Sequence, residues 1–342
     1  MIVVSFCLPN LFGLSRASNK WVFNMNYKYI GIISILLIIS IFTYNTFTYV
    51  ESKNTITISG AWALYPMMIK WSEEYQKINP NVRIEISAGG AGKGMVDALA
   101  GLVDIGMVSR EIYPEEINRG AFWVSVVKDA VISTVNRDNP ILEDILEKGI
   151  KRSIFIDIYV HGNITTWGQV IGNPKITDEI HLYTRSDSCG AAETWANYMG
   201  YRQEDLKGIA VYGDPGVAEA VKNDRLGIGF NNINYAYDAK TNLPVEGLMI
   251  VPLDLNEDGE VNENEDFYEN RNSIINAIII GAYPSPPARE LNLVTKDSFT
   301  GATKDFVRWI LTEGQNYALE TGYVPLSSER CAEWLKTLEG QK

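Results

Sequence analysis

Three short segments of the chain combine small residues with the expected start of a helix: residues 60–66, 89–94 and 184–193. Small residues let the backbone approach a ligand closely. The first N–H groups of a helix lack intrahelical partners and lie at the positive end of the helix dipole. A tetrahedral oxyanion accepts hydrogen bonds from several directions, so several helix starts around one point would suit it.

Arg185 lies in the third of these turns and could add a bidentate, charge-assisted pair to such an anion. Each turn by itself is more often a packing feature, and a single arginine is more often a surface charge. The combination of three turns with Arg185 in one chain favours a binding site for a small oxyanion.

The composition fits this interpretation. The chain has 342 residues, of which 46% are hydrophobic and 21% are charged, enough for two globular domains. Its formal net charge of −12 argues against nucleic-acid binding, which requires a basic face. It does not argue against a small anion, because a buried anion is held by local dipoles and a few cations.

The pattern of strands and helices predicts an α/β fold with a mainly parallel sheet. Period-two and β-branched runs predict strands, and apolar stripes at helical spacing predict helices. Strands are expected at 55–59, 82–86, 103–108, 130–135 and 277–280, and helices at 66–79, from after the glycine-rich turn 87–92 to about 100, and at 302–320. The polar segment 136–140, which ends in proline, predicts a domain boundary.

The first 50 residues differ from the rest. Lys20 and Lys28 precede an apolar run over residues 30–42, which is typical of a secretory signal. Extended to residue 50, the run approaches the length of a membrane anchor, so a cleaved signal and a retained anchor both remain open. Met25 is a second possible start. The cysteines Cys7, Cys189 and Cys331 are too few to indicate a disulfide framework.

Residues 254–265 match the calcium loop of EF-hands at each specified position. The predicted ligands are the side chains of Asp254, Asn256, Asp258 and Glu265 and the carbonyl of Glu260. The alternative is a solvated acidic loop. We expect a single Ca²⁺ that stabilises the second domain rather than a calcium sensor.

Two enzyme classes can be tested against the residues. Cys189 at a helix start could be a nucleophile, but His161 and His181 belong to no recognised pairing with it. A phosphate-binding loop of the nucleotide hydrolases requires Ser or Thr after Lys93, where this chain has Gly94. The chain is therefore expected to bind without catalysis.

The chain resembles the phosphate-binding proteins of phosphate ABC importers, within the two-domain class of periplasmic-type binding proteins (type II). The resemblance covers nearly all of residues 55–337. It is carried by the motifs at residues 58–61, 87–92, 103–110, 161–167, 185–190, 227–230 and 322–326. It implies two α/β lobes joined by two hinge strands, with the ligand in the cleft between them.

The same resemblance implies the division of the chain and its role. Residues 1–52 would be the leader, residues 55–136 and 278–342 the first lobe, and residues 137–277 the second. The protein would be an extracytoplasmic monomer, cleaved from its leader or anchored by residues 30–50. It would capture phosphate and pass it to a membrane permease with its ATPase.

Carried over position by position, the resemblance implies a ligand site in which several hydroxyls are lost. The implied ligand-binding residues are Ala63, Leu64, Tyr65, Gly90, Ala91, Gly92, Ser109, Arg110, Arg185, Asp187, Cys189, Gly190 and Ala191. Arg185 and Gly190 match the family, whereas hydroxyls are missing at Leu64, Ala91, Cys189 and Ala191. Ser109-Arg110 replaces an aspartate that some members use. Backbone N–H groups, including those of Leu64 and Tyr65, are therefore expected to replace the missing hydroxyls.

This loss bears on selectivity. Phosphate at neutral pH carries a proton, and a buried donor left without an acceptor costs about 1–3 kcal/mol. The available acceptors are Asp187 and Asp104, although Asp104 is equally suited to a structural cap. A sulfate-like oxyanion and a receptor that senses its ligand without transport remain the alternatives.

Overall fold

The computed structural model describes residues 13–17, 20–24 and 54–340, and the chain divides into two compact units, residues 1–53 and 54–342. In the first unit, β1 (Gly13–Ala17) and β2 (Lys20–Asn24) form an antiparallel pair. The apolar run at 30–50, Met25 and Cys7 lie outside the described residues. Within the described parts, no helix has both the length and the hydropathy that crossing a membrane requires.

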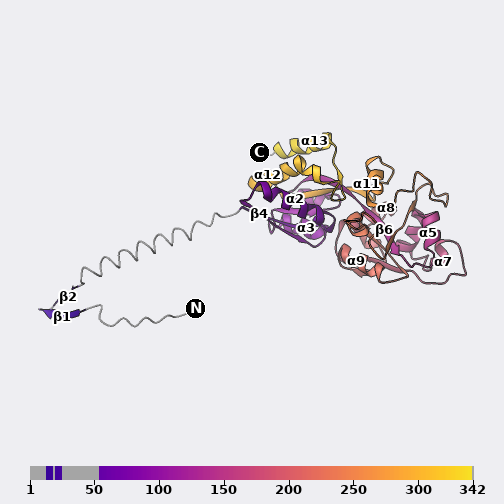
Figure 1. The fold of residues 1–342 in the computed structure, drawn as a ribbon, viewed down its shortest axis with the longest axis horizontal. Helices are drawn as coiled ribbons and strands as arrows, with labels where there is room; N and C mark the ends of the chain where they lie inside the picture. The colour runs from indigo at the N-terminus through magenta and orange to yellow at the C-terminus, as the bar shows by residue number, and fades with distance from the viewer. Residues whose placement is uncertain (1–12, 18–19, 25–53, 341–342) are drawn as a thin grey trace. The chain divides into compact units, whose positions relative to one another are not determined.

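The second unit is built on a ten-stranded sheet with the order β4-β3-β5-β13-β6-β10-β8-β9, to which β11 and β14 add along β6 (Figure 1). Its two ends are parallel, and its centre is antiparallel. The strands are β3 (Asn54–Gly60), β4 (Val82–Ala88), β5 (Ile105–Val108), β6 (Ala121–Asn136), β8 (His181–Arg185), β9 (Ile209–Val211), β10 (Gly227–Asn232), β11 (Leu248–Ile250), β13 (Ala288–Lys296) and β14 (Val324–Pro325). A separate parallel pair joins β7 (Ile150–Lys151) to β12 (Leu253–Asp254).

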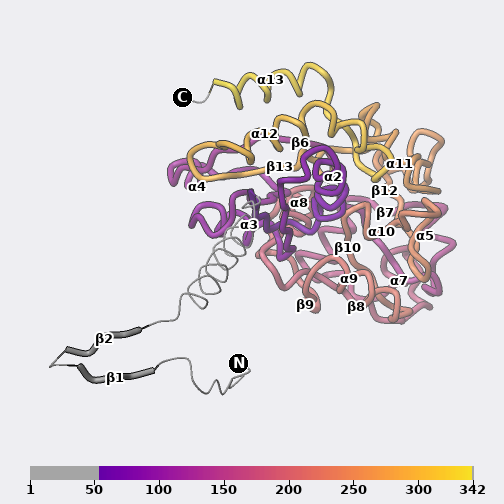
Figure 2. The backbone as a smooth tube through the Cα atoms, turned by 60° about the vertical axis from the view of Figure 1, so that its left-hand side comes forward, coloured from indigo at the N-terminus to yellow at the C-terminus, as the bar shows by residue number. Residues whose placement is uncertain are grey.

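Helices connect and cover these strands. They are α2 (Tyr65–Ile78), α3 (Ala91–Leu99), α4 (Pro114–Asn118), α5 (Leu142–Lys148), α6 (Arg152–Ile156), α7 (Trp167–Val170), α8 (Gly190–Met199), α9 (Gly213–Lys222), α10 (Ile233–Ala236), α11 (Arg271–Ile279), α12 (Gly301–Leu311) and α13 (Ser328–Glu339). The 3₁₀ turns are η1 (Trp62–Leu64), η3 (Gln203–Asp205) and η4 (Glu313–Tyr317), and η2 (Asp157–His161) is a π-helical turn. In Figure 2, α2 and the late helix α12 lie together although they are far apart in sequence, and they are in contact.

Two hydrophobic cores define two lobes within this unit. Lobe 1 contains buried residues up to Val127 and again from Leu291 onward, including the face of α2 that carries Trp71. The main core of lobe 2 begins at Ala130 and runs to Ala288, with Val324 of β14 added to it. The strands β6 and β13 pair with one another and pass from one core to the other. The cores therefore meet inside these two strands, rather than at residues 136 and 278.

The mixed α/β fold and most expected elements are confirmed, but the expectation of a mainly parallel sheet is wrong, because the pairings of β13, β10, β11 and β14 with β6 make its centre antiparallel. Two expected elements are also wrong. Residues 277–280 are not a strand, because they end α11. Asn270 caps that helix by accepting from the Ser273 N–H, and Ile274 and Ile278 bury one helical face. The long C-terminal helix ends at Leu311, because the backbone of Thr312 leaves the helical region.

Candidate functional site

The three predicted turns lie where lobe 1 meets lobe 2. The Gly92 N–H donates to the Ser188 carbonyl over 3.0 Å, which joins the second turn to the third. A methyl group on Gly190 would lie 2.0 Å from the Ser109 carbonyl oxygen, so only glycine allows this approach. The first turn also contacts lobe 2, since the Tyr235 hydroxyl donates to the Trp62 carbonyl over 3.2 Å.

The third turn starts α8 through a cysteine cap. Cys189 has extended backbone angles, and its Sγ accepts from the Ala192 N–H at 3.4 Å. The Cys189 N–H donates to Gln203 Oε1. In the first turn of α8, this leaves the N–H groups of Gly190 and Ala191 as donors for a ligand. Burial raises the pKa of the Cys189 thiol to about 12, so it is a neutral cap rather than a nucleophile.

Arg185 ends β8 with its side chain fully buried between two carboxylates. Its Nε and Nη2 donate to the two oxygens of Asp187 at 2.8 and 2.6 Å, and its Nη1 donates to Asp214 Oδ2 at 2.6 Å. Burial lowers the pKa of Arg185, but Asp214 and the other neighbouring charges outweigh burial and raise it overall. A guanidinium has five N–H donors, so these bonds leave two N–H groups, one on each terminal nitrogen.

Asp214 is a site residue that the sequence analysis missed. It lies in the first turn of α9, is completely buried, and its Oδ1 accepts from both the backbone N–H and the side chain of Asn232 at 2.9 Å. Gly213-Asp214-Pro215 has the composition of a helix start, with an acidic residue and a proline in the first turn. That signal could have added a fourth helix end to the predicted three.

A second buried arginine, also missed, lies on the strands that join the lobes. Arg289 of β13 donates to Asn232 Oδ1, and its Nη2 is 3.9 Å from Asp129 Oδ2 on β6. The Nε and Nη1 groups of Arg289 have no partner, and neither has Asp129 Oδ1. Burial raises the pKa of Asp129 to about 7 and lowers that of Arg289, which Asp129 partly opposes. In the sequence, the only indication of this pair was that Arg289 and Asp129 are charged residues within otherwise apolar segments that form strands.

The predicted contribution of the first turn is partly wrong. The Leu64 N–H donates to the Ala61 carbonyl, and the Tyr65 N–H donates to the Trp62 carbonyl. The turn η1 therefore uses the two N–H groups that were expected to serve the ligand. The Leu64 side chain is in the lobe 1 core, and the Ala63 carbonyl accepts from the Tyr323 hydroxyl at 2.6 Å.

Two further charges predicted near the site have structural partners. Arg110 forms a two-pronged pair with Glu116 and lies over the Tyr113 ring at 4.2 Å. Asp104 Oδ2 accepts from both the backbone N–H and the hydroxyl of Thr57. Asp104 is therefore a cap, which leaves Asp187 as the carboxylate beside the predicted ligand turns.

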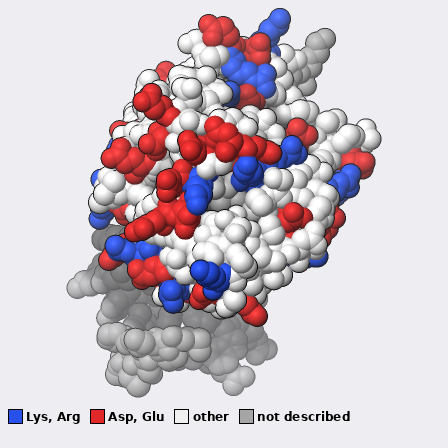
Figure 3. All heavy atoms as spheres, turned by 90° about the vertical axis from the view of Figure 1, so that its right-hand side faces the viewer, with Lys and Arg blue, Asp and Glu red and all other residues white. Residues whose placement is uncertain are grey.

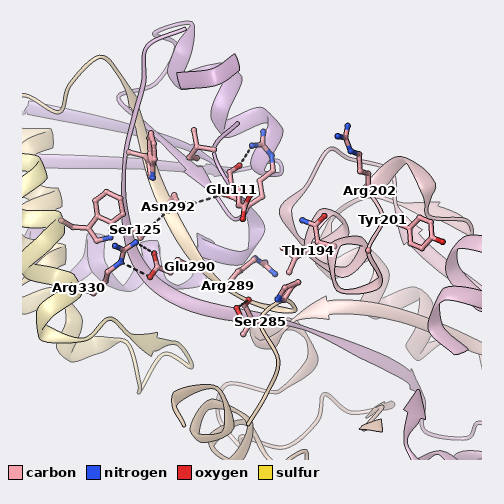
Figure 4. Close-up of a pocket in the computed structure, with 18 of the residues that line it drawn as sticks. Glu111, Ser125, Thr194, Tyr201, Arg202, Ser285, Arg289, Glu290, Asn292 and Arg330 are labelled. Atoms are coloured by element: carbon pink, nitrogen blue, oxygen red, sulfur yellow. Dashed lines mark hydrogen bonds and ion pairs between the residues drawn. The ribbon is translucent and has the colours of Figure 1, made fainter. Parts of the chain in front are cut away.

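A polar cavity of about 1180 Å³ adjoins this junction. Thr194 lines it from α8 in lobe 2, Arg289 and Glu290 line it from β13, and Arg330 lines it from lobe 1 (Figure 4). Arg330 is paired with Glu290. Arg289 is thus a partly unpaired cation that lines this cavity.

The predicted calcium ligands lie apart from this junction, at Asp254 in the last position of β12 and in the loop that follows it. Among the residues that the structure describes, no three histidine, cysteine or acidic side chains are grouped closely enough to hold a metal.

Two lobes joined by paired strands, with turns from both lobes meeting at a buried arginine, define the class of bilobal solute-binding proteins. The sequence pattern of the PBP superfamily domain matches residues 48–313. The chain belongs to that superfamily.

Several proteins similar to this chain are named as phosphate-binding proteins. The phosphate-binding protein PstS of Methanocaldococcus jannaschii is 27% identical over 339 residues, covering 82% of this chain and 85% of that protein. The PstS protein of Bacillus subtilis is 24% identical, covering 81% and 82%. A Clostridium perfringens structure with bound phosphate, described as a phosphate ABC transporter substrate-binding protein, has a TM-score of 0.65 at 23% identity and covers 80% of this chain and all of that one. That structure supports the fold.

Proposed function

We propose that this protein captures phosphate outside the cytoplasm and delivers it to an ABC importer made of a permease and an ATPase. Its superfamily and the names of its relatives support this function. The observation that carries it is Arg185, fully buried where the lobes meet, with two carboxylates that orient it and two N–H groups left for an oxyanion.

The charges around Arg185 favour an oxyanion that carries a proton. Arg185 is paired with Asp187 and Asp214, so the group is net negative before any ligand arrives. A methyl group on Gly90 would lie 2.8 Å from Asp187 Oδ2, which places this oxygen at the start of α3. A carboxylate oxygen there can accept the proton of phosphate, whereas sulfate has no proton to give and would face repulsion.

The contacts between the lobes support capture by closure. Ser109 lies against Gly190, and Gly92 donates to Ser188, so the backbones of the two lobes touch around the site. Gly190→Ala would place a methyl group 2.0 Å from the Ser109 carbonyl oxygen and hold the lobes apart. We expect phosphate affinity to fall by about 100-fold, measured by calorimetry, while the melting temperature without ligand changes little. Unchanged affinity would contradict closure at this contact.

The test of the ligand is a calorimetric comparison of phosphate and sulfate on the purified protein. We expect phosphate to bind more tightly, and Asp187→Asn to reduce the preference by about tenfold because the proton loses its acceptor. Glu193→Gln, an acidic residue in the same segment, serves as a control that keeps Asp187. Equal affinities for the two anions in the unaltered protein would reject phosphate selectivity.

Transport is separated from sensing in cells. Deletion of the gene is expected to reduce uptake of radiolabelled phosphate at low external concentration, and restored uptake should require Arg185. A strain with normal uptake would favour a receptor without transport. Fractionation of the same cells tests the proposed leader, because a retained anchor at residues 30–50 keeps the protein with the membrane and a cleaved signal releases it.

A further inference from the structure

We propose that residues 254–265, in the loop that follows β12 of lobe 2, form a structural calcium site separate from the oxyanion site. The loop has an oxygen-bearing residue at each of the positions 1, 3, 5, 7 and 12 of the twelve-residue calcium loop, with glycine at position 6. Calcium takes six to eight oxygen ligands of this mixed carboxylate, amide and carbonyl type.

The first half of the loop already has a conformation that turns its side chains inward. Gly259 has φ of +88°, a value that favours glycine, and its N–H donates to Asp254 Oδ2 at 2.9 Å. The Asp258 N–H donates to Asn256 Oδ1, and the Glu260 N–H donates to Asp258 Oδ1. These bonds fix the side chains at positions 1, 3 and 5 while leaving oxygen lone pairs for an ion.

An independent observation points to a cation at position 1. Asp254 is 1% exposed, and its Oδ1 is buried without a hydrogen-bond partner. A buried carboxylate oxygen without a donor is unfavourable unless a cation compensates it. The nearest ammonium is that of Lys151, which lies 3.9 Å from the other oxygen, Oδ2, and donates to the Glu257 carbonyl. Lys151 is a third exposed on a flexible stem, so it can withdraw when an ion enters.

The ligand at position 12 is folded back over the loop. Glu265 is 4% exposed, and its Oε1 accepts from the N–H groups of Leu255 and Asn256 while its Oε2 accepts from that of Asn262. The acidic side chains therefore do not form a ready cluster among the described residues. Binding requires Glu265 to exchange some of these bonds for the ion, which predicts a site of modest affinity.

The loop is attached to the surrounding lobe at several points. Leu253 pairs with Ile150 in the β12–β7 ladder, and the Val261 N–H donates to the Glu147 carbonyl at the end of α5. The Leu253 N–H also donates to the buried Tyr268 hydroxyl. An ion in the loop would therefore hold α5 and β7 to the core of lobe 2. The face of the molecule beyond α5 and α7 carries a broad band of Asp and Glu side chains, which attracts cations (Figure 3).

The test uses terbium, a luminescent substitute for calcium, on the purified full-length protein. Tyr268 lies next to β12 and can sensitise the emission. We expect terbium emission that calcium displaces, and a rise in melting temperature of about 2–5 °C in about 10 mM calcium, given the millimolar affinities of extracellular sites. Magnesium at the same concentration should give a smaller shift, because it demands a tighter octahedral site.

Three variants locate the site. Glu265→Gln should abolish both signals, whereas Glu263→Gln, the same change two residues away at a position without a ligand role, should preserve them. Lys151→Met should increase calcium affinity by about threefold or more, since it removes a competing positive charge. Far-UV circular dichroism without calcium checks that each variant folds.

Two outcomes would overturn the proposal. One is that the unaltered protein shows no terbium emission and no change of melting temperature with calcium. Lys151 would then be the permanent counter-ion of the loop. The other is an equal loss of signal in Glu263→Gln and Glu265→Gln, which would indicate diffuse attraction to an acidic surface. Neither outcome depends on phosphate binding.

Discussion

Arg185 and Arg289 are both buried near the junction of the lobes, but their surroundings differ. Arg185 makes three short hydrogen bonds to two carboxylates. Burial lowers its pKa, but Asp214 and the other neighbouring charges outweigh burial, so the pKa is raised overall. Arg289 donates to one amide, its carboxylate neighbour Asp129 is 3.9 Å away, and burial lowers its pKa. The first arginine is held in one geometry, whereas the second has N–H groups that still need a partner.

The difference suggests separate tasks for the two cations. A guanidinium clamped by carboxylates is oriented for specific hydrogen bonds, but its charge is already compensated. A partly unpaired guanidinium supplies positive charge to an arriving anion. The predictions below test whether Arg185 provides geometry and Arg289 provides charge.

The largest effect is expected for Arg185→Lys. The variant keeps the positive charge but loses the planar fork, and it leaves Asp187 and Asp214 without their shared partner. Phosphate affinity should fall by at least about 100-fold in calorimetry. Affinity within a few fold of the unaltered protein would show that charge alone suffices at this position. The melting temperature separates lost binding from lost folding.

A smaller effect is expected for Arg289. Arg289→Met should weaken phosphate binding by about tenfold, because a charge near the site is removed without a direct orienting role. Arg289→Lys should recover most of this loss. If lysine fails where arginine works, Arg289 provides geometry as well, and the contrast with Arg185 disappears.

Asp129 predicts the pH dependence of stability. Its pKa is about 7 in the folded protein and about 3.8 when unfolded, so the folded state holds the proton more tightly. Stability therefore falls as pH rises from about 4 to 7, by up to about 4 kcal/mol. Asp129→Asn should remove this slope in urea unfolding measured across that range. A slope that persists in the variant would assign it to another group.

The smallest effect is expected for Cys189→Ser, which adds a hydroxyl where the family resemblance implies one. The cap should remain, since serine is a good N-cap. Phosphate affinity should rise by about twofold to tenfold, the value of one added hydrogen bond. Ser186→Ala, in the same turn but outside the predicted ligand set, is the matched control. No gain in Cys189→Ser would mean that this side chain does not reach the ligand.

The sequence predicted the parts of the site that form a local motif. Arg185 and the glycine turns could be recognised because their residues are contiguous and have a shared physical design. The helix start at Asp214 was visible in the sequence, but its pairing with Arg185 and the role of Arg289 were not, because they depend on β10 bringing Asn232 between Asp214 and Arg289. A pairing across the sheet depends on strand order, which no local pattern specifies.

The fold shows the same limit. The strands β3, β4 and β5 and the helices α2 and α3 of lobe 1 follow from alternation, stripes and turn residues close in sequence. The erroneous strand at 277–280 arose because a short apolar run fits a buried strand or a buried helix equally well. The side chain of Asn270 caps the N-terminus of the helix. Because Asn270 lies outside the apolar run, the run alone does not reveal the helix. The N–H groups of Leu64 and Tyr65 were misjudged for a similar reason, since the tight turn that uses them is not visible in residue types.

The strands β6 and β13 have a kinematic consequence. They form one two-stranded ribbon through both cores, and their register shifts between Leu291 and Asn292, close to the point where the cores meet. A ribbon bends most easily at such an irregularity. If the lobes separate by bending at this point, Arg289 and Asp129, which lie close to it, would be displaced less than Arg185, which ends β8 in lobe 2. Such bending would leave the charge of Arg289 in place at the cavity while Arg185 moved with lobe 2.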